Sequence, residues 1–272
     1  MLIDFHTHAF PDKIAEHAIS SLERNLLEFT GDESRSHANY RGTVGELNNS
    51  MKENRVDISV VLPIATTLTQ SASINRFAAE ITGHDGIISF GSLHPMQPDA
   101  EKELLKIKEM GLKGIKLHPE YQEFYINSPR AVELLKLAEE LELYVVLHTG
   151  KDLGRPEPVH CPPQLLADVL NHVSGKYIIA AHMGGYLLWE DVLKHLAGTD
   201  ITFDTSFCLG EMPKDLAREI IRKHSADKIV FGSDSPWASP KDIYNSLKNL
   251  NLSQNDLDKI TYKNAYRILE IS

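Results

Sequence analysis

Histidines and one aspartate stand where buried runs of the sequence end. His6 and His8 form a His-x-His pair after an apolar run, and His148, His182 and Asp234 each end a similar run. Taken singly, such residues are more often hydrogen-bonded loop groups or helix caps. Burying several imidazoles and a carboxylate together costs several kcal/mol unless a cation holds them. Their joint placement therefore predicts a metal site.

Three imidazoles and one carboxylate suit zinc or a similar divalent transition ion and leave a coordination position open. Such an ion lowers the pKa of bound water to about 7, which makes a nucleophile available at neutral pH. A deprotonated Asp234 beside that water is able to take and relay its proton. The expected chemistry is attack by activated water.

These residues need elements that bring them together, and the chain offers short apolar runs rich in β-branched residues. The runs read as buried parallel strands because they are apolar on both faces. They are Met1–His6, Ile58–Pro63, Ile87–Ser92, Gly114–His118, Leu143–His148, Tyr177–His182, Ile201–Thr205 and Lys228–Ser233.

Segments with helical spacing alternate with these runs, which predicts an α/β fold closed into a (β/α)8 TIM barrel rather than an open doubly wound sheet. The predicted helices are Val44–Asn54, Ala100–Met110, Pro129–Leu141, Pro162–Val173, Trp189–Leu196 and Pro213–His224. In such a barrel the C-terminal strand ends converge on one cavity, where catalytic residues collect.

Two connections are longer than a barrel requires. The interval Ala9–Asn54 is predicted to hold an insertion after strand 1, on the catalytic face, where it would act as a lid. Gly150–Pro163 is predicted to be a long loop. Ser253–Glu270 reads as C-terminal helices that close the barrel. We expect a single domain over residues 1–272.

The composition argues against two classes of binding partner. The 272 residues carry a formal net charge of -10 and no basic stripe, which argues against nucleic acid and anionic membranes. Cys161 and Cys208 are too few for a disulfide framework, and the first residues lack a secretion signal. We expect a cytoplasmic protein that acts on a small molecule, and a homo-oligomer is compatible with its sequence.

The order of five motifs resembles the amidohydrolase superfamily, and within it the amidohydrolase-2 branch. That branch contains metal-dependent hydrolases and also decarboxylases similar to aminocarboxymuconate semialdehyde decarboxylase. The motifs are Ile3-Asp4-Phe5-His6-Thr7-His8, Gly114-Ile115-Lys116-Leu117-His118-Pro119, His148-Thr149-Gly150, Ala181-His182-Met183-Gly184-Gly185 and Gly232-Ser233-Asp234-Ser235-Pro236.

The resemblance implies roles for these residues. His6, His8 and His148 would be metal ligands, Asp234 the fourth ligand and proton carrier, and His182 the group that polarises substrate or activates water. It implies a divalent ion, with zinc preferred.

Lys116 stands where binuclear relatives resembling phosphotriesterase carry a carboxylated lysine. A second ion held by Lys116, His148 and His182 is one interpretation. An uncarboxylated Lys116 that contacts an anionic substrate is the other, and His118 follows on the same face. The preference at this point is for one ion.

Other positions carry weaker signals. Arg155 and His160 are candidates for holding a substrate carboxylate or carbonyl, and Trp237 for a pocket wall. Asp204 is expected to support the barrel mouth or contact a ligand histidine. Cys161 is not expected to be a nucleophile with its neighbour His160, because adjacent residues on an extended loop point apart.

The leading hypothesis is a metal-dependent hydrolase that directs activated water at an amide, ester or lactone-like bond. The main alternative is a non-oxidative decarboxylase, or carboxy-lyase, of a small unsaturated or aromatic acid. A phosphoesterase of the polymerase-and-histidinol-phosphatase type is less favoured, because that family usually has a histidine two residues after its late aspartate, where Pro236 stands here. A non-catalytic barrel that keeps a metal for stability is disfavoured by the complete acid and base partners.

Overall fold

Short parallel strands form the centre of the molecule. The computed structural model describes residues 1–155 and 157–271. Each strand overlaps one of the predicted runs, which confirms the parallel α/β fold. The strands are β1 (Ile3–Thr7), β2 (Ile58–Val61), β3 (Ile87–Ser89), β4 (Gly91–Ser92), β5 (Gly114–Leu117), β6 (Tyr144–Leu147), β7 (Ile178–Ala180), β8 (Thr202–Asp204) and β9 (Ile229–Val230).

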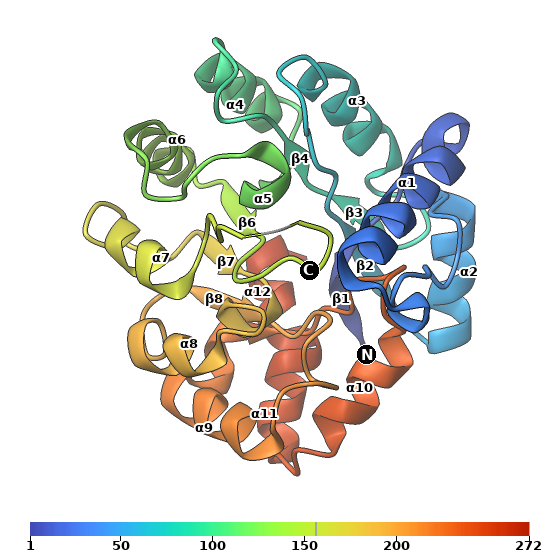
Figure 1. The fold of residues 1–272 in the computed structure, drawn as a ribbon, viewed down its shortest axis with the longest axis vertical. Coiled ribbons are helices and arrows are strands. Elements are labelled where there is room, and N and C mark those ends of the chain that lie inside the picture. Colours follow the sequence, from blue (N-terminus) through green and yellow to red (C-terminus); the bar gives the residue numbers. More distant parts are fainter. Residues whose placement is uncertain (156, 272) are drawn as a thin grey trace.

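The strands are arranged in a ring with two joins. β3 and β4 belong to one predicted run, interrupted at Phe90, and β3 pairs with β2 while β4 pairs with β5. The Phe90 N–H donates to the Val61 carbonyl at 2.9 Å, which continues the pairing across the interruption. At the other join, Thr7 forms a parallel bridge to Ser235, which follows β9. Figure 1 shows the resulting ring of strands surrounded by helices, the arrangement expected of a (β/α)8 barrel.

Helices follow the strands around the ring. The predicted helix Val44–Asn54 is reproduced with the same bounds, and Pro162–Val173 is shortened to Pro163–Val169. The helices are α1 (Asp12–Thr30), α2 (Val44–Asn54), α3 (Ser71–Ile81), α4 (Ala100–Glu109), α5 (Pro119–Gln122), α6 (Pro129–Glu140), α7 (Pro163–Val169), α8 (Trp189–His195), α9 (Lys214–His224), α10 (Pro240–Lys248), α11 (Gln254–Asp258) and α12 (Asn264–Leu269).

The insertion after β1 is itself helical. α1 begins after Pro11 and ends at Gly31, whose φ of 65° is the left-handed conformation that terminates many helices. α2 then starts with a capping box between Thr43 and Glu46. In Figure 1, α1 lies over the ring near β1 and β2. Its residues line the same cavity as the side chains at the C-terminal strand ends.

The lower part of the ring is filled by apolar side chains, and α12 packs beneath it. This core cluster comprises Ile3, Phe5, Val60, Leu62, Phe90, Val146, Ile179 and Val230 from the ring, with Ala265, Ile268 and Leu269 of α12. A second cluster lies between the strands and the outer helices. No described helix is long and apolar enough to cross a membrane.

The register of β1 against β2 shifts between Asp4 and Thr7. Phe5 packs edge-on against Phe90 in the core, whereas His6, the next residue, reaches side chains at the top of the ring. Strict alternation would send adjacent residues to opposite faces. A bulge re-aims a side chain in this way, so the irregularity in β1 is what brings His6 into the site.

Candidate metal centre

The first donor group lies at the join between β1 and the segment after β9. His6 Nε2 is 3.3 Å from Asp234 Oδ1, and His8 Nε2 is 3.1 Å from the same oxygen. Ligand atoms held about 2.1 Å from one metal ion stand about 3.0–3.4 Å from one another. Gly232 makes room for this approach, because a Cβ there would lie 2.8 Å from His6 Cβ.

The hydrogen bonds of the two rings decide which nitrogens carry protons. His6 Nδ1 donates to Asp204 Oδ2 at 2.8 Å, and His8 Nδ1 donates to the Leu62 carbonyl at 2.9 Å. In their neutral forms the two rings therefore present bare Nε2 lone pairs to the Asp234 carboxylate. Burial, helped by the Lys116 cation, lowers the pKa of His6 to about 4, so a second proton does not relieve this contact at neutral pH.

With both rings neutral, three lone-pair donors thus converge, and no hydrogen of His6, His8 or Asp234 lies between them, which is the environment that a divalent cation satisfies. Burial alone would raise the pKa of Asp234, but the positive charge that His6, His8 and His182 carry when protonated holds that pKa below the usual range for a carboxyl. The residues present fit a metal ion. His6, His8 and Asp234 are brought together as the sequence predicted.

A second pair of nitrogens faces each other across the ring. His148 Nδ1 lies 3.0 Å from His182 Nε2. His182 Nδ1 is 3.0 Å from the Ser206 carbonyl, and His148 Nε2 is 3.2 Å from the Lys151 carbonyl. Because carbonyls only accept, these outer nitrogens carry the protons, and the two inner nitrogens face each other as lone pairs. This arrangement also fits a cation.

His148 was predicted to bind the same ion as His6, His8 and Asp234. In the structure, His148 Nδ1 instead faces His182. Among the described residues, the donor group at the β1 end consists of His6, His8 and Asp234 and does not include His148. Membership of His148 in that ligand set stays a prediction.

Backbone geometry positions the second pair. His182 and Met183 have φ of 58° and 55°, a left-handed conformation that is strained for residues with a Cβ and recurs at functional sites. Gly150, two residues after His148, has φ 85°, and a Cβ there would lie 2.2 Å from the Tyr186 nitrogen. The glycine of the His-Thr-Gly motif is therefore required by close backbone approach.

Lys116 lies between the two donor groups. Its side chain is 1% exposed, and Nζ is 3.3 Å from His6 Nε2. Burial lowers the pKa of this amine to about 8, against the opposing effect of Asp204 and Asp234. The sequence prediction that Lys116 faces the site agrees with this position.

A further group comprises His118, His148 and Asp152. His118 Nε2 is 3.4 Å from Asp152 Oδ2, and its ring stacks on His148 at 4.1 Å. His118 Nδ1 accepts the Tyr121 N–H, so Nε2 carries the proton and donates to Asp152. His118 therefore orients Asp152 rather than offering a lone pair to a metal ion. The sequence pattern gave no signal for Asp152, which lies in an irregular loop.

The family of the chain follows from a family model. The model described as "Amidohydrolase" matches residues 3–271. The chain belongs to the amidohydrolase family. Comparison with curated proteins finds no match.

Solved structures with the same fold are only distantly similar to this amidohydrolase in sequence. A 2,6-dihydroxybenzoate decarboxylase complexed with 2,6-dihydroxybenzoate has a TM-score of 0.69 at 15% identity, with 99% of each chain covered. A dihydroxybenzoic acid decarboxylase from Polaromonas sp. JS666, with bound manganese and an inhibitor, has 0.67 at 15%, covering 99% of this chain and 96% of the other. A probable 2-pyrone-4,6-dicarboxylic acid hydrolase from Acinetobacter baumannii has 0.67 at 16%, with 99% of each chain covered.

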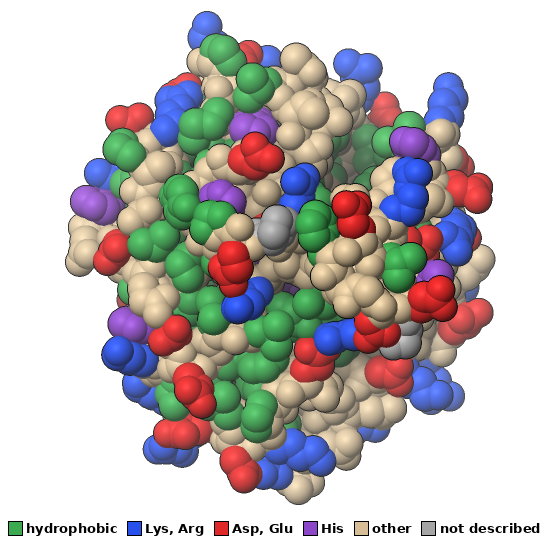
Figure 2. Space-filling view, viewed as in Figure 1, with side chains coloured by type: hydrophobic (Ala, Val, Ile, Leu, Met, Phe, Trp, Pro, Cys, Tyr) green, Lys and Arg blue, Asp and Glu red, His purple; other side chains and the backbone are tan. Residues whose placement is uncertain are grey.

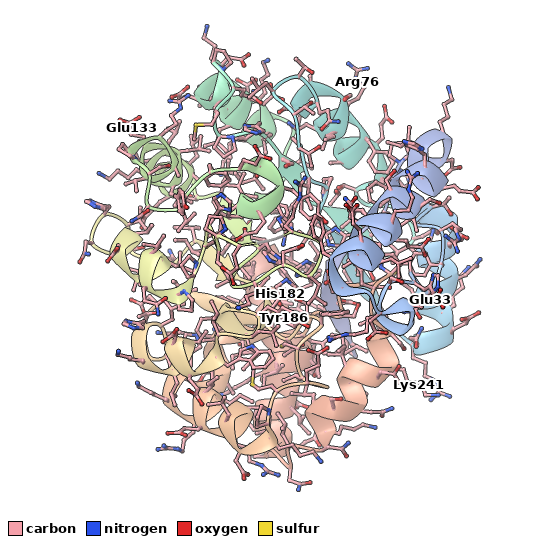
Figure 3. The ribbon with its side chains drawn as sticks, in the orientation of Figure 1. Glu33, Arg76, Glu133, His182, Tyr186 and Lys241 are labelled. Atoms are coloured by element: carbon pink, nitrogen blue, oxygen red, sulfur yellow. The ribbon has the colours of Figure 1, made fainter. Side chains whose placement is uncertain are left out.

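Both donor groups of the amidohydrolase open into one cavity of about 600 Å³. Figure 3 shows His182 and Tyr186 near the centre of the ring. Trp237 lines this cavity, as predicted for a pocket wall. Arg155 instead stacks over Tyr121, 4.7 Å from its ring centroid, and lies outside the lining. His160 packs against Tyr125 and also lies outside, so the structure does not bring either residue to the cavity.

Asp204 is the carboxylate that orients both donor groups. Besides His6 Nδ1, it accepts the backbone N–H of His182 at 2.9 Å and that of Ser206 at 3.0 Å. The expected contact with a ligand histidine is therefore present. The side chain is fully buried, and its histidine partners hold the pKa below the usual range although burial opposes them.

Asp204→Asn is expected to weaken metal binding by about 10–100-fold, because an amide cannot fix the His6 tautomer as a carboxylate does. The measurement is a competition titration against a chelating dye. Asp200→Asn, on the exposed turn before β8, is the control and should bind metal as the wild type does. Equal affinity in Asp204→Asn would contradict the orienting role.

Glu120 is buried, and only one of its carboxylate oxygens has a hydrogen-bond partner among the described residues. Oε1 accepts the His160 N–H at 2.7 Å, while Oε2 has no such partner in the part of the chain that the structure describes. Burial, reinforced by Asp152, raises the pKa of Glu120 to about 7. Between its unfolded pKa near 4.5 and this value the folded protein binds the additional proton, so this group makes stability fall as pH rises through that window.

Glu120→Gln is expected to remove that contribution, which amounts to about 3 kcal/mol of unfolding free energy from pH 4.5 to 7. Urea unfolding at several pH values measures it, as the difference between variant and wild type. Exposed Glu123→Gln should behave as the wild type. A variant with the same pH dependence as the wild type would remove Glu120 as the source.

Proposed function

We propose that this amidohydrolase is a metal-dependent hydrolase that uses activated water to cleave an amide, ester or lactone-like bond of a small molecule. The observation that carries the proposal is the convergence of lone pairs from His6, His8 and Asp234 at the inner end of the cavity. Zinc is the ion that we propose, on the chemistry of imidazole and carboxylate donors.

When bound, such an ion supplies Lewis acidity, which activates water and polarises a carbonyl. Asp234 remains ionised at neutral pH because its histidine neighbours lower its pKa. Its side chain is 14% exposed, and it borders the cavity. It is therefore placed to accept the proton of the attacking water and to pass that proton to the leaving group.

We propose a narrower role for His182 than the resemblance implied. Its Nδ1 proton is engaged by Ser206, so neutral His182 has no hydrogen to donate to a substrate oxygen. Its free nitrogen is an acceptor or a ligand. We propose one ion at His6, His8 and Asp234 and a second at His148 and His182, with Lys116 between them.

Decarboxylation is the second candidate, and the cavity favours it less. Two cationic side chains in the described lining have carboxylate partners, Arg35 with Glu211 and Lys151 with Glu157 at 2.9 Å, and a third, Lys116, lies beside the metal donors with Nζ 3.3 Å from His6 Nε2. A fourth, Lys13, is exposed on the first turn of α1. The described lining therefore offers few free cationic side chains to bind a substrate carboxylate at a distance from the metal donors. A neutral carbonyl compound requires no such cation.

The test uses a panel of small amides, esters, lactones and carboxylic acids with metal-loaded protein in water enriched in oxygen-18. Hydrolysis incorporates the label into the acid product. Decarboxylation releases carbon dioxide and leaves the organic product unlabelled. Label incorporation that chelation abolishes and metal restores is the expected result. Carbon dioxide release without labelling would replace the proposal by the second candidate.

A further inference from the structure

The cavity has a polar inner end and an apolar outer part. The metal donors gather at the inner end, whereas its outer part is lined by apolar side chains of α1, the residues after β2 and α3. Figure 2 shows hydrophobic side chains in the recess between α1 and α3, at the upper right of the view. We call this outer part the α1–α3 slot, defined by Ile14, Ala18, Leu22, Leu26, Ile64, Ile74 and Phe77.

The α1 wall of the slot is a regular stripe. Ile14, Ala18, Leu22 and Leu26 recur every four residues, so they lie on one face of the helix. The residues by which α1 packs on the protein are different ones, Ala15 and Ile19, which are fully buried. The helix therefore has a packing face and, beside it, an apolar face turned to the cavity.

That second face is costly to leave against water. Ile14 is 51% exposed, Ala18, Leu22 and Leu26 are half-buried, and apolar surface that borders a cavity in this way is typical of a binding site. The opposite wall of the slot is also apolar, since Ile74 and Phe77 lie three residues apart on one face of α3. Two facing apolar helix surfaces that end at a metal centre make a site for an elongated apolar group.

We propose that the α1–α3 slot binds an extended alkyl chain whose carbonyl head reaches the metal donors. This inference rests on the proposed function for the reaction at the head, and on the slot itself for the chain. The substrate class is therefore an amphiphilic acyl compound, such as a medium-chain ester, amide or lactone, rather than a compact polar acid. Chain length should decide affinity, because each buried methylene strengthens binding about threefold to fourfold.

The test measures binding separately from turnover. Calorimetry of the metal-loaded protein with butyrate, hexanoate, octanoate and decanoate should show an affinity for decanoate at least tenfold greater than that for hexanoate, with a negative heat-capacity change. Ala18→Trp places a bulky ring in the middle of the stripe and should remove this length dependence. Its metal content and thermal midpoint should match those of the wild type.

His17→Trp is the matched control, because His17 is exposed on the same helix and lies outside the slot lining. It should retain the length dependence. Decanoate that binds no more tightly than butyrate would overturn the slot, as would an unchanged length dependence in Ala18→Trp.

Turnover of p-nitrophenyl esters of the same acids separates the two proposals. Rates that rise with chain length support both. Hydrolysis of every ester at one rate would keep the proposed function and overturn the slot. Length-dependent binding of the acids, with no hydrolysis of esters, amides or lactones, would keep the slot and overturn the proposed function.

Discussion

Replacing Asp234 by asparagine is expected to lower kcat/KM by about 10³-fold while leaving the fold intact. The carboxylate has two expected roles. Its Oδ1 is the metal-ligand oxygen that lies beside both His6 Nε2 and His8 Nε2, and it is also the group placed to take a proton from water. An amide is nearly the same size, but it is neither anionic nor basic. Its N–H groups would also face the two histidine nitrogens as donors, which competes with a cation for the same lone pairs.

Steady-state kinetics on any substrate found in the panel, together with circular dichroism and metal analysis, checks this result. Asp215→Asn is the matched control, since that carboxylate is almost fully exposed on α9 and far from the cavity lining. Its kinetics should equal those of the wild type. A fully active Asp234→Asn protein would remove Asp234 from both of its roles.

Metal content should fall in steps when the two donor groups are removed separately. His6→Ala is expected to lose the ion held with His8 and Asp234, and His148→Ala the ion held with His182, so each variant should keep about one of two equivalents. Element-specific analysis after gel filtration measures the stoichiometry, and the thermal midpoint should fall with each lost ion. His172→Ala, on an exposed turn after α7, should keep both.

The same pair of variants discriminates between the ligand sets. If the wild type holds one equivalent and either substitution removes it, the set of His6, His8, His148 and Asp234 expected from the sequence is right and the two-ion proposal is wrong. If His6→Ala loses metal and His148→Ala does not, the first donor group would be a metal site and the second would not. The distinction is worth making because both sets use the same strand ends.

Much of the fold was predictable because parallel strands buried on both faces give continuous apolar runs. The ends of those runs also identified His6, His8, His148, His182 and Asp234, since the barrel brings all such ends to one cavity. The interruption at Phe90 was not predictable, because its apolar side chain fits the run on either side.

Other features depended on tertiary contacts that carry no local period. Asp152 lies in an irregular loop, and only its contact with His118 gives it a role. The cavity-facing stripe of α1 was missed because its apolar residues sit beside the packing residues Ala15 and Ile19. In the sequence they merge into one broad apolar pattern, and the structure is needed to divide it between protein and cavity.

The first donor group spans the join of the ring, with His8 and Asp234 separated by 226 positions in the chain. During synthesis, one part of this group leaves the ribosome near the start of the barrel and the other near its end. No partly made chain can hold an ion there. Metal capture at His6, His8 and Asp234 is therefore a late event, which marks a completed ring and cannot guide its earlier assembly.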